Sequence, residues 1–434
     1  MKKAAAYLIA AILCSTMITA CAQGIDIHNT TMGDESSAST CAAQLTTFTL
    51  FADDSSDGAV YKSLLEEFKA KNQAVQISDT SEAFSEDIVT ELAAAFESGS
   101  QPDVFFFHTG VNAAAFTKEN LIVPVDEIKV KYPDYAQDIA PYALESIADG
   151  GKAMAVPVRG FYEGLFVNTD LFEQYELELP TNWPLFVKAI NAFSKAGIIP
   201  VSASLNDTPH YLLDQLILAA GGAQNYKTLP KAVGEVPQSW LSAMQTLSSL
   251  NKQGAFGQPE ACSSEGEATD LFMQKKAAMK ADGSWLVARL EASGLGDSTI
   301  VLPFPMPEGG KRTDGEITGG FSSGFYISRK AWDDVQKQAA AVKLVEQLTT
   351  AEAIGRFSNI AGLPAVKGGK PVSQSKLAQS AFELCSKVST AIKPLDARMD
   401  ANTWNSVISN AAAVAKDEQT AEQVFGKAFD NTAN

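Results

Sequence analysis

The segment Pro102–Phe107, PDVFFF, limits the possible folds more than any other short stretch of this 434-residue chain. Its last residues, Val104 to Phe107, are all apolar and follow a proline and an aspartate. An apolar run of this length is typical of a β-strand that is covered on both faces. Such a strand requires helices on both sides of its sheet, which is the arrangement of α/β proteins.

The residues before this segment alternate between strand and helix patterns. LTTFTLF (45–51) alternates as a strand does, and AVQI (74–77) is a second short strand. Two amphipathic helical patterns have their apolar positions at Val60, Leu64, Leu65 and Phe68, and at Phe84, Ile88, Leu92 and Phe96. We therefore predict an open α/β sheet with helices on both faces, and a ligand rim beyond its strands at 53–57 and 107–110.

A second α/β unit follows later in the chain. GLFVNTDLF (164–172) and GIIPVSASL (197–205) contain strand patterns, and YLLDQLILAAGG (211–222) is an apolar helix that ends in glycines. Further helices are predicted at 183–195, 331–348 and 405–415. With the length of the chain, these units predict two or three domains, or one large two-lobed body.

The N-terminus has the pattern of an export signal. Lys2 and Lys3 precede an uncharged, apolar run from Ala4 to Ala20. This run predicts a signal peptide over 1–20 rather than a membrane-spanning helix, because it is short and no basic stop-transfer cluster follows it.

The sequence Ile18-Thr19-Ala20-Cys21 resembles the lipobox of bacterial lipoproteins. The resemblance implies cleavage before Cys21 and a lipid, such as palmitate, on its sulfur. The polar stretch 21–43 is then a flexible, lipid-anchored linker. A secretory signal with an incidental cysteine is the alternative.

The charge balance excludes some partners. Without Lys2 and Lys3, 32 basic residues remain against 51 acidic ones, a net charge of −19. An acidic body repels phosphate backbones, so we expect no nucleic-acid partner. It also disfavours a polybasic contact with anionic lipid, so membrane attachment is expected to come from the lipid on Cys21.

The remaining cysteines form no recognisable framework. Cys41 lies in the polar linker, and Cys262 and Cys385 are far apart, with no CxxC or Cys/His spacing. We therefore expect no metal site. Spacing alone leaves open whether Cys262 and Cys385 form a disulfide.

Three motifs suggest chemistry but lack the context that it needs. DDSSDG (53–58) begins like a calcium loop, yet Leu64 stands where the bidentate glutamate is required. GFSSG (320–324) matches the pattern around a nucleophilic serine, but a strand pattern follows it instead of a helix. Carboxylates for glycoside cleavage abound without a spacing that singles out a pair. The glycines around Ser322 more plausibly permit a bend between lobes.

Aromatic residues at the ends of predicted elements are more informative. Trp285 follows the expected strand AAMKA (277–281), Tyr211 opens a helix, and Phe161 stands between two apolar segments. Rings exposed at such positions can stack on the faces of sugars, with neighbouring carboxylates and arginine for hydroxyl groups. Taken singly, each ring is also compatible with an ordinary place in the core.

Several segments, taken in order, resemble the extracellular solute-binding proteins of ABC importers, in the sugar-binding group that includes the maltodextrin-binding proteins. The segments are PDVFFF, AVPVRGFYEGLFVNTDLF, LPTNWPLFVKAI, FMQKKAAMKADGSW, VLPFPMPEGG, GGFSSGFYIS and AGLPAV. They span nearly the whole mature chain. The resemblance implies a two-lobed periplasmic-binding-protein-like fold, in which each lobe is an open α/β sheet and the ligand cleft lies between the lobes.

The same resemblance implies where the chain crosses between the lobes. The expected crossings are near 158–160, 319–322 and 392–395. The expected ranges are 44–158 and 321–390 for lobe 1, and 159–320 and 391–434 for lobe 2.

The resemblance also implies ligand-binding residues. Trp285, Tyr211 and Trp404 fall on positions where the maltodextrin-binding proteins carry cleft aromatics. Phe161 stands in place of a sugar-binding glutamate, whose hydrogen bond is either lost or supplied by Glu163. Because an Asp-Arg pair of that group is also absent here, a mono- or oligosaccharide other than maltodextrin is favoured. The full expected set is Asp54, Ser55, His108, Thr109, Arg159, Phe161, Glu163, Tyr211, Asp282, Trp285, Ser322 and Trp404.

The expected function is therefore capture of a sugar by hinge closure and its delivery to the transmembrane permease subunits of an ABC importer. The protein would act without catalysis or cofactor, as a monomer on the extracellular face of the cell membrane. A secreted, lipid-anchored glycoside hydrolase and a carbohydrate-binding adhesin are the alternatives.

Overall fold

The computed structural model describes residues 43–51, 56–82, 86–117, 119–205, 210–257, 262, 264–357, 362–366 and 374–430. The predicted signal peptide, Cys21 and nearly all of the predicted linker lie outside these ranges, as do Asp54 and Ser55. Within them, no helix combines the length and the apolarity that a membrane crossing requires.

The strands are β1 (Ala43–Thr49), β2 (Val75–Asp79), β3 (Val104–His108), β4 (Ala148–Asp149), β5 (Lys152–Ala153), β6 (Val156–Pro157), β7 (Arg159–Asn168), β8 (Ile199–Val201), β9 (Ala277–Gly283), β10 (Thr299–Leu302), β11 (Glu316–Gly320), β12 (Ser323–Ile327), β13 (Leu363–Pro364) and β14 (Thr390–Ile392). The helices before β8 are α1 (Ser56–Lys71), α2 (Glu86–Ser98), α3 (Ala114–Thr117), α4 (Val125–Lys131), α5 (Pro141–Ser146), α6 (Thr169–Gln174) and α7 (Trp183–Ala196).

The helices after β8 are α8 (His210–Lys227), α9 (Gln238–Lys252), α10 (Glu265–Met273), α11 (Trp285–Ala292), α12 (Arg329–Asp333), α13 (Val335–Leu348), α14 (Ala351–Phe357), α15 (Lys376–Ser386), α16 (Ala401–Ala415) and α17 (Ala421–Asp430). Short 3-10 turns lie at Gly110–Ala113, Val233–Glu235 and Leu395–Ala397. The glycines at the predicted end of α8 only interrupt it, because the backbone is non-helical at Gly222 (φ 65°) and helical geometry then resumes.

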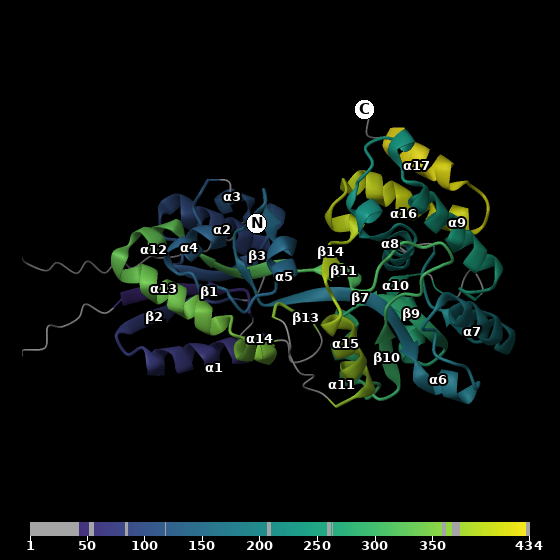
Figure 1. Cartoon of the computed structure of the whole chain (residues 1–434), viewed down its shortest axis with the longest axis horizontal. Helices are drawn as coiled ribbons and strands as arrows, with labels where there is room; N and C mark the ends of the chain where they lie inside the picture. The colour runs from purple at the N-terminus through teal and green to yellow at the C-terminus, as the bar shows by residue number, and fades with distance from the viewer. Residues whose placement is uncertain are drawn as a thin grey trace, which may run out of the picture. The chain divides into compact units, whose positions relative to one another are not determined.

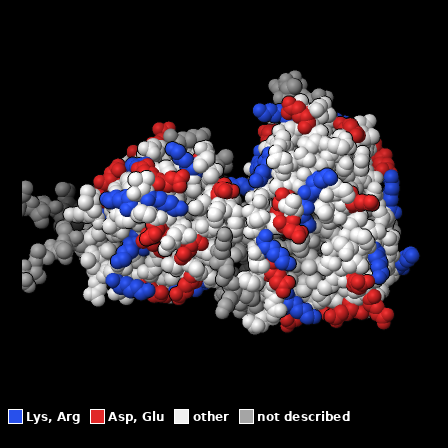
Figure 2. Space-filling model, viewed as in Figure 1, with Lys and Arg blue, Asp and Glu red and all other residues white. Residues whose placement is uncertain are grey.

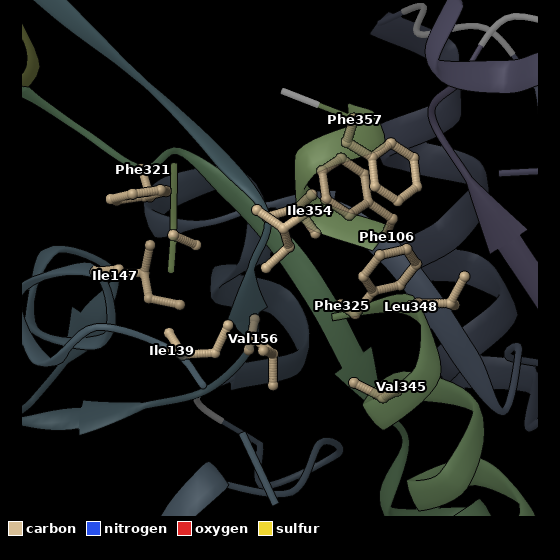
Figure 3. Packing of buried hydrophobic residues seen from close by; sticks show 14 of the residues in the cluster. Phe106, Ile139, Ile147, Val156, Phe321, Phe325, Val345, Leu348, Ile354 and Phe357 are labelled. Atoms are coloured by element: carbon tan, nitrogen blue, oxygen red, sulfur yellow. The ribbon is translucent and has the colours of Figure 1, made fainter. Parts of the chain in front are cut away.

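The first sheet has the strand order β2-β1-β3-β12-β6, and Figure 1 labels β1, β2 and β3 among its strands. β1 runs parallel to β2 and β3, whereas β12 is antiparallel to β3. Phe105 contacts Phe96 of α2 and Phe116 of α3, whereas Phe106 contacts Phe325 and shares a hydrophobic cluster with Leu348 of α13, which packs on β1 and β12 (Figure 3). Helices therefore cover both faces, and the prediction made from PDVFFF is confirmed: Val104–Phe107 are buried.

The second sheet has the strand order β14-β11-β7-β9-β8, and β10 also pairs with β7. One face carries a core cluster under α7, α8, α9, α16 and α17. On the other face α10 packs on β9 and α15 packs on β10. The predicted α/β fold with two lobes is thus confirmed, and Figure 2 shows acidic and basic side chains interspersed over the surface in view.

The chain passes between the two sheets at short, adjoining strands. β6 pairs with β12 in the first sheet, and β7 begins in the second sheet two residues later. β11 pairs with β7, and the chain then continues as β12 of the first sheet. One element differs from the expected ranges, because α15, which we assigned to lobe 1, packs on β10 of the second sheet. The lobe boundaries themselves stay a prediction.

Glycines allow these linking strands to touch. A Cβ at Gly160 would lie 2.2 Å from the carbonyl oxygen of Gly320, and a Cβ at Gly319 would lie 2.5 Å from that of Phe161. The neighbouring atoms are backbone, so they cannot move aside as a flexible side chain can. The approach of β7 and β11 therefore depends on the absence of side chains at these positions.

Gly160→Ala is expected to destabilise the fold by about 1–3 kcal/mol, the usual range for a methyl group forced into a packed site. Gly426→Ala is the matched control, because Gly426 lies inside α17 and a Cβ added there would meet no atom within 4 Å. That change should be neutral or stabilise by about 0.5–1 kcal/mol. Denaturant unfolding of both variants measures the difference, and equal stabilities would show that the strands separate without cost.

Candidate functional site

A cavity of about 450 Å³ lies where the linking strands meet, and we call it the first cavity. Its lining comes from elements of both sheets. The aromatic lining residues are Phe51, Phe106, Phe161, Trp285 and Phe357, and the polar ones are Asp57, Arg159, Ser284, Ser322 and Ser323. A cavity of this size with mostly apolar walls and few polar groups is typical of a small-molecule site.

Three aromatic rings gather at one wall of the first cavity. Trp285 is 49% exposed, which is unusual for a tryptophan next to a core. Its ring centre lies 5.3 Å from that of Tyr211 and 6.0 Å from that of Phe161, with interplanar angles of 48° and 42°. The Tyr211 and Phe161 rings are therefore tilted against the Trp285 ring, and about half of Trp285 stays exposed.

The turn between β9 and α11 holds Trp285 in this place. Its ring lies directly against Gly283, where a Cβ would be only 2.1 Å from the ring. The Gly283 amide donates to Asp282 Oδ1 at 2.7 Å, and the Ser284 amide donates to the Tyr162 carbonyl at 2.8 Å. The small residues of ADGSW thus serve to seat the tryptophan ring.

Asp282 is itself fixed by a buried cation. Lys280 is fully buried, and its Nζ lies 2.5 Å from Glu265 Oε2 and 3.5 Å from Asp282 Oδ2. Because a buried ammonium group is stable only when paired, both carboxylates are needed to neutralise Lys280. Asp282 therefore positions the turn that carries Trp285, and it does not line the first cavity.

An ion pair supplies the charged part of the first cavity. Arg159 Nη2 donates to Asp57 Oδ2 at 2.6 Å, and Nη1 also donates to the carbonyl oxygen of Phe357 at 3.4 Å. Burial raises the pKa of Asp57, and the positive charge of Arg159 opposes this rise. Asp57 also lies in the first turn of α1, where the helix dipole favours a carboxylate.

The ends of β3 and β12 supply neutral polar groups. The Thr109 amide donates to the Ser322 carbonyl at 2.8 Å, and His108 Nδ1 lies 3.1 Å from Ser323 Oγ. Burial lowers the pKa of His108, although a hydrogen bond from its ring to the Ser322 backbone opposes this shift. Ser322 precedes the strand β12 and not a helix, so the strand predicted after GFSSG is confirmed.

The structure brings about half of the expected ligand-binding residues together. Arg159, Phe161, Trp285 and Ser322 line the first cavity, Tyr211 contacts Trp285, and His108 and Thr109 contact the serines of its wall. Glu163, Asp282 and Trp404 lie elsewhere. Asp57, Phe51 and Phe357 line the cavity and were missed as site residues, although the rim predicted at 53–57 included Asp57.

Trp404 belongs to the core and not to the first cavity. It is 2% exposed, and it shares one face of α16 with Val407, Ile408 and Ala411. These residues have the i, i+3, i+4, i+7 spacing of a core-facing stripe. Trp404 therefore does not have the stacking role that the resemblance implied. The helical spacing of its neighbours indicated its place in the core more reliably.

Glu163 lies beneath α8, two residues beyond Phe161 on β7. It is 1% exposed, and its Oε2 accepts a hydrogen bond from Gln215 Nε2 at 3.2 Å. Burial raises the pKa of Glu163 well above its usual range, and the nearby Asp214 carboxyl raises it further. Glu163 was expected to offer a hydrogen bond to a ligand in the first cavity. It instead accepts one from Gln215 inside the lobe.

Two further results concern cysteines and metals. Cys262 and Cys385 are both buried and free, so they do not form a disulfide with each other. In the part of the chain that the structure describes, no three or more His, Cys, Asp or Glu side chains are grouped to hold a metal ion.

Comparison with known proteins adds to this geometry. The family model of bacterial extracellular solute-binding proteins matches residues 52–354. The multiple sugar-binding protein of Streptococcus mutans is 23% identical over 329 residues, which are 74% of this chain and 75% of that protein.

Solved structures show the same fold. A probable secreted solute-binding lipoprotein from Streptomyces coelicolor has a TM-score of 0.74 at 17% identity, and the match covers 89% of this chain and 98% of that one. The bacterial solute receptor AcbH, which has an exclusive preference for β-D-galactopyranose, has a TM-score of 0.69 at 18% identity, with coverage of 91% and 98%.

The buried Glu163 carboxyl predicts a pH effect on stability. Its pKa is raised in the folded state, so the stability that it contributes is complete below the pKa of the unfolded chain, near 4.3, and is lost as the pH rises through the folded pKa. Glu163→Gln keeps the shape of the side chain but cannot ionise, so the variant does not lose this stability as the pH rises. The variant should therefore gain melting temperature relative to the native protein between pH 5 and pH 8.5.

Glu178→Gln is the control for this measurement, because the Glu178 side chain is 71% exposed. The difference in melting temperature between Glu178→Gln and the native protein should stay nearly constant over the same pH range. If the difference in melting temperature between Glu163→Gln and the native protein is equally constant, Glu163 is ionised in the folded protein at all these pH values.

Proposed function

Because the chain belongs to the family of bacterial extracellular solute-binding proteins, we propose that it is the sugar-binding lipoprotein of an ABC importer. It captures a mono- or oligosaccharide outside the cell and delivers it to the permease subunits in the membrane. The family match and the relative in Streptococcus mutans, a multiple sugar-binding protein, support this assignment.

The observation that carries the sugar proposal is the pairing of aromatic and ionic groups in the first cavity. A sugar ring has a face of C–H groups and an edge of hydroxyl groups. The accessible face of Trp285 suits the C–H face, because the π-system is negative there. Asp57 and Arg159 offer charged acceptors and donors to the hydroxyl edge, and such hydrogen bonds are stronger than neutral ones.

The proposed mechanism is closure about the linking strands. The lining of the first cavity includes Phe106 of the first sheet and Trp285 of α11, which follows β9 of the second sheet, so a ligand that fills the cavity contacts both lobes. Contacts that form only when the lobes approach each other favour the closed state by their full binding free energy. The crossings at β6–β7 and β11–β12 are the segments that would absorb the movement.

The N-terminal pattern supports a place outside the cell. A receptor that is tethered by lipid on Cys21 through the linker 21–43 stays close to its permease without inserting a helix in the membrane. Stable anchoring by acyl chains needs more than one chain, as a bacterial lipoprotein would provide. We propose a monomer, because a single chain supplies both walls of the first cavity.

A glycoside hydrolase is less well supported by this cavity. Retaining and inverting enzymes need two carboxyl groups about 5–10 Å apart across the scissile bond. Asp57 is the one acidic residue among the described residues that line the first cavity, and it is paired with Arg159. Incubation of the pure protein with labelled oligosaccharides should give binding without turnover.

The adhesin alternative would be favoured by the absence of permease genes beside the gene for this protein.

A thermal-shift screen with a panel of mono- and oligosaccharides identifies the ligand. A sugar that binds only the folded protein raises the melting temperature as its concentration exceeds the dissociation constant. The absence of any shift across hexoses, pentoses and their oligomers would remove the support for a sugar ligand.

Trp285→Ala should weaken binding of the identified sugar about thirtyfold or more, since loss of a central aromatic contact costs about 2–4 kcal/mol. Its effect on the melting temperature without ligand should be small, because Trp285 is 49% exposed. Trp404→Ala is the matched control and should have the opposite profile, with a loss of about 3–5 kcal/mol of stability. Calorimetry and thermal unfolding distinguish the two. Retained affinity in Trp285→Ala would exclude the stacking role.

Cys21→Ala should release the protein into the medium or leave it unprocessed, because the acceptor of the lipid is removed. Cys41→Ala changes the other cysteine of the N-terminal polar stretch and should leave the protein on the cells. Fractionation followed by mass measurement checks both variants. Cell-bound, mature Cys21→Ala protein would refute the lipid anchor.

A further inference from the structure

A second cavity, of about 280 Å³, lies at an opening in the second sheet. On one edge of β7, β11 pairs with residues 161–162 and β10 pairs with residues 165–168. Glu163 and Gly164 lie between these pairings. The second cavity occupies this gap, and it shares none of its lining residues with the first cavity.

The inner end of the second cavity carries an acid with an unused oxygen. Glu163 lines the cavity, and its Oε1 is buried without a hydrogen-bond partner among the described residues. Its Oε2 already accepts from Gln215 Nε2 at 3.2 Å. A buried polar atom without a partner costs free energy, so it marks a place where a missing hydrogen-bonding group would fit.

The outer part of the second cavity carries a cation that has two carboxylates near it but no ion pair among the described residues. Arg312 lines the cavity, and its guanidinium forms no ion pair with any residue in the described ranges. The negative charges that act on Arg312 come from Asp314, which also lines the cavity, and from Glu316, whose Oε2 already accepts hydrogen bonds from the amides of Ala223 at 2.9 Å and Thr313 at 3.2 Å. Partial burial lowers the pKa of Arg312, but a guanidinium stays charged at any neutral pH.

We propose that the second cavity binds a small hydroxycarboxylate, with its carboxylate at Arg312 and its hydroxyl group at Glu163. A planar guanidinium matches a carboxylate in two parallel hydrogen bonds, which no neutral group reproduces. The volume lies at the small end of the range for ligand sites, so the ligand has only a few carbon atoms.

The protonation of Glu163 makes this arrangement consistent. Burial and the nearby Asp214 carboxyl favour its neutral form. Because Oε2 is already the acceptor for Gln215, the proton lies on Oε1, which donates it to the oxygen of the ligand hydroxyl. A neutral Glu163 also does not repel the carboxylate of the ligand.

The probes for this site are sodium L-lactate, sodium propionate and propane-1,2-diol. Propionate lacks the hydroxyl group of lactate, and the diol lacks its carboxylate. Titrations followed by saturation-transfer NMR at pH 7 should show saturable binding of lactate. Propionate should bind at least fivefold more weakly, and the diol at least tenfold more weakly. The absence of saturable lactate binding, or equal binding of propionate, would overturn the proposal.

Variants assign the binding to this cavity. Arg312→Gln should weaken lactate binding at least tenfold, and its melting temperature shows whether the fold is kept. Arg289→Gln removes the same charge from α11, where Arg289 pairs with Asp270 at 2.6 Å, and should leave lactate binding unchanged. Trp285→Ala should also leave it unchanged. Loss of lactate binding in Trp285→Ala, or its retention in Arg312→Gln, would contradict the proposed site without bearing on sugar capture.

Discussion

The close backbone contact between β7 and β11 is the constraint on which the rest of the structure depends. Glycines at 160 and 319 let the two strands touch where side chains would collide. β7 then supplies Arg159 and Phe161 to the first cavity and Glu163 to the second. A shift of this strand would therefore move both cavities together.

The two cavities differ in how their polar groups are satisfied. In the first cavity Asp57 and Arg159 neutralise each other, so a neutral molecule with hydroxyl groups can bind without bringing a charge of its own. In the second cavity Glu163 Oε1 has no hydrogen-bond partner among the described residues, and Arg312 has the charges of Asp314 and Glu316 near it but forms no ion pair there. The chemistry of each proposed ligand follows from this difference, because a buried site favours a molecule that completes its hydrogen bonds and its charge balance.

Sequence patterns predicted the elements well where the periodicity was strong. The strand PDVFFF and the helix 183–195 were found at nearly the expected bounds, because burial alone fixes such patterns. The expectation for Trp285 also fits its position, since ADGSW contains the small residues against which the ring lies. Trp404 shows the limit of an argument from resemblance: the position suggested a cleft aromatic, whereas the stripe along α16 indicated the core, and the structure follows the stripe.

By itself the sequence determined the alternation of strands and helices, the acidic surface and the export pattern, because composition and periodicity are local properties. The tertiary structure decided which side chains meet. Asp57 and Arg159 are far apart in the chain and come together only because α1 and the start of β7 adjoin the same cavity. Glu163 and Phe161 lie on the same strand, yet one is covered by α8 and the other faces the first cavity. Such choices depend on long-range packing, since a residue's exposure is set by the elements that cover it and not by its neighbours in sequence.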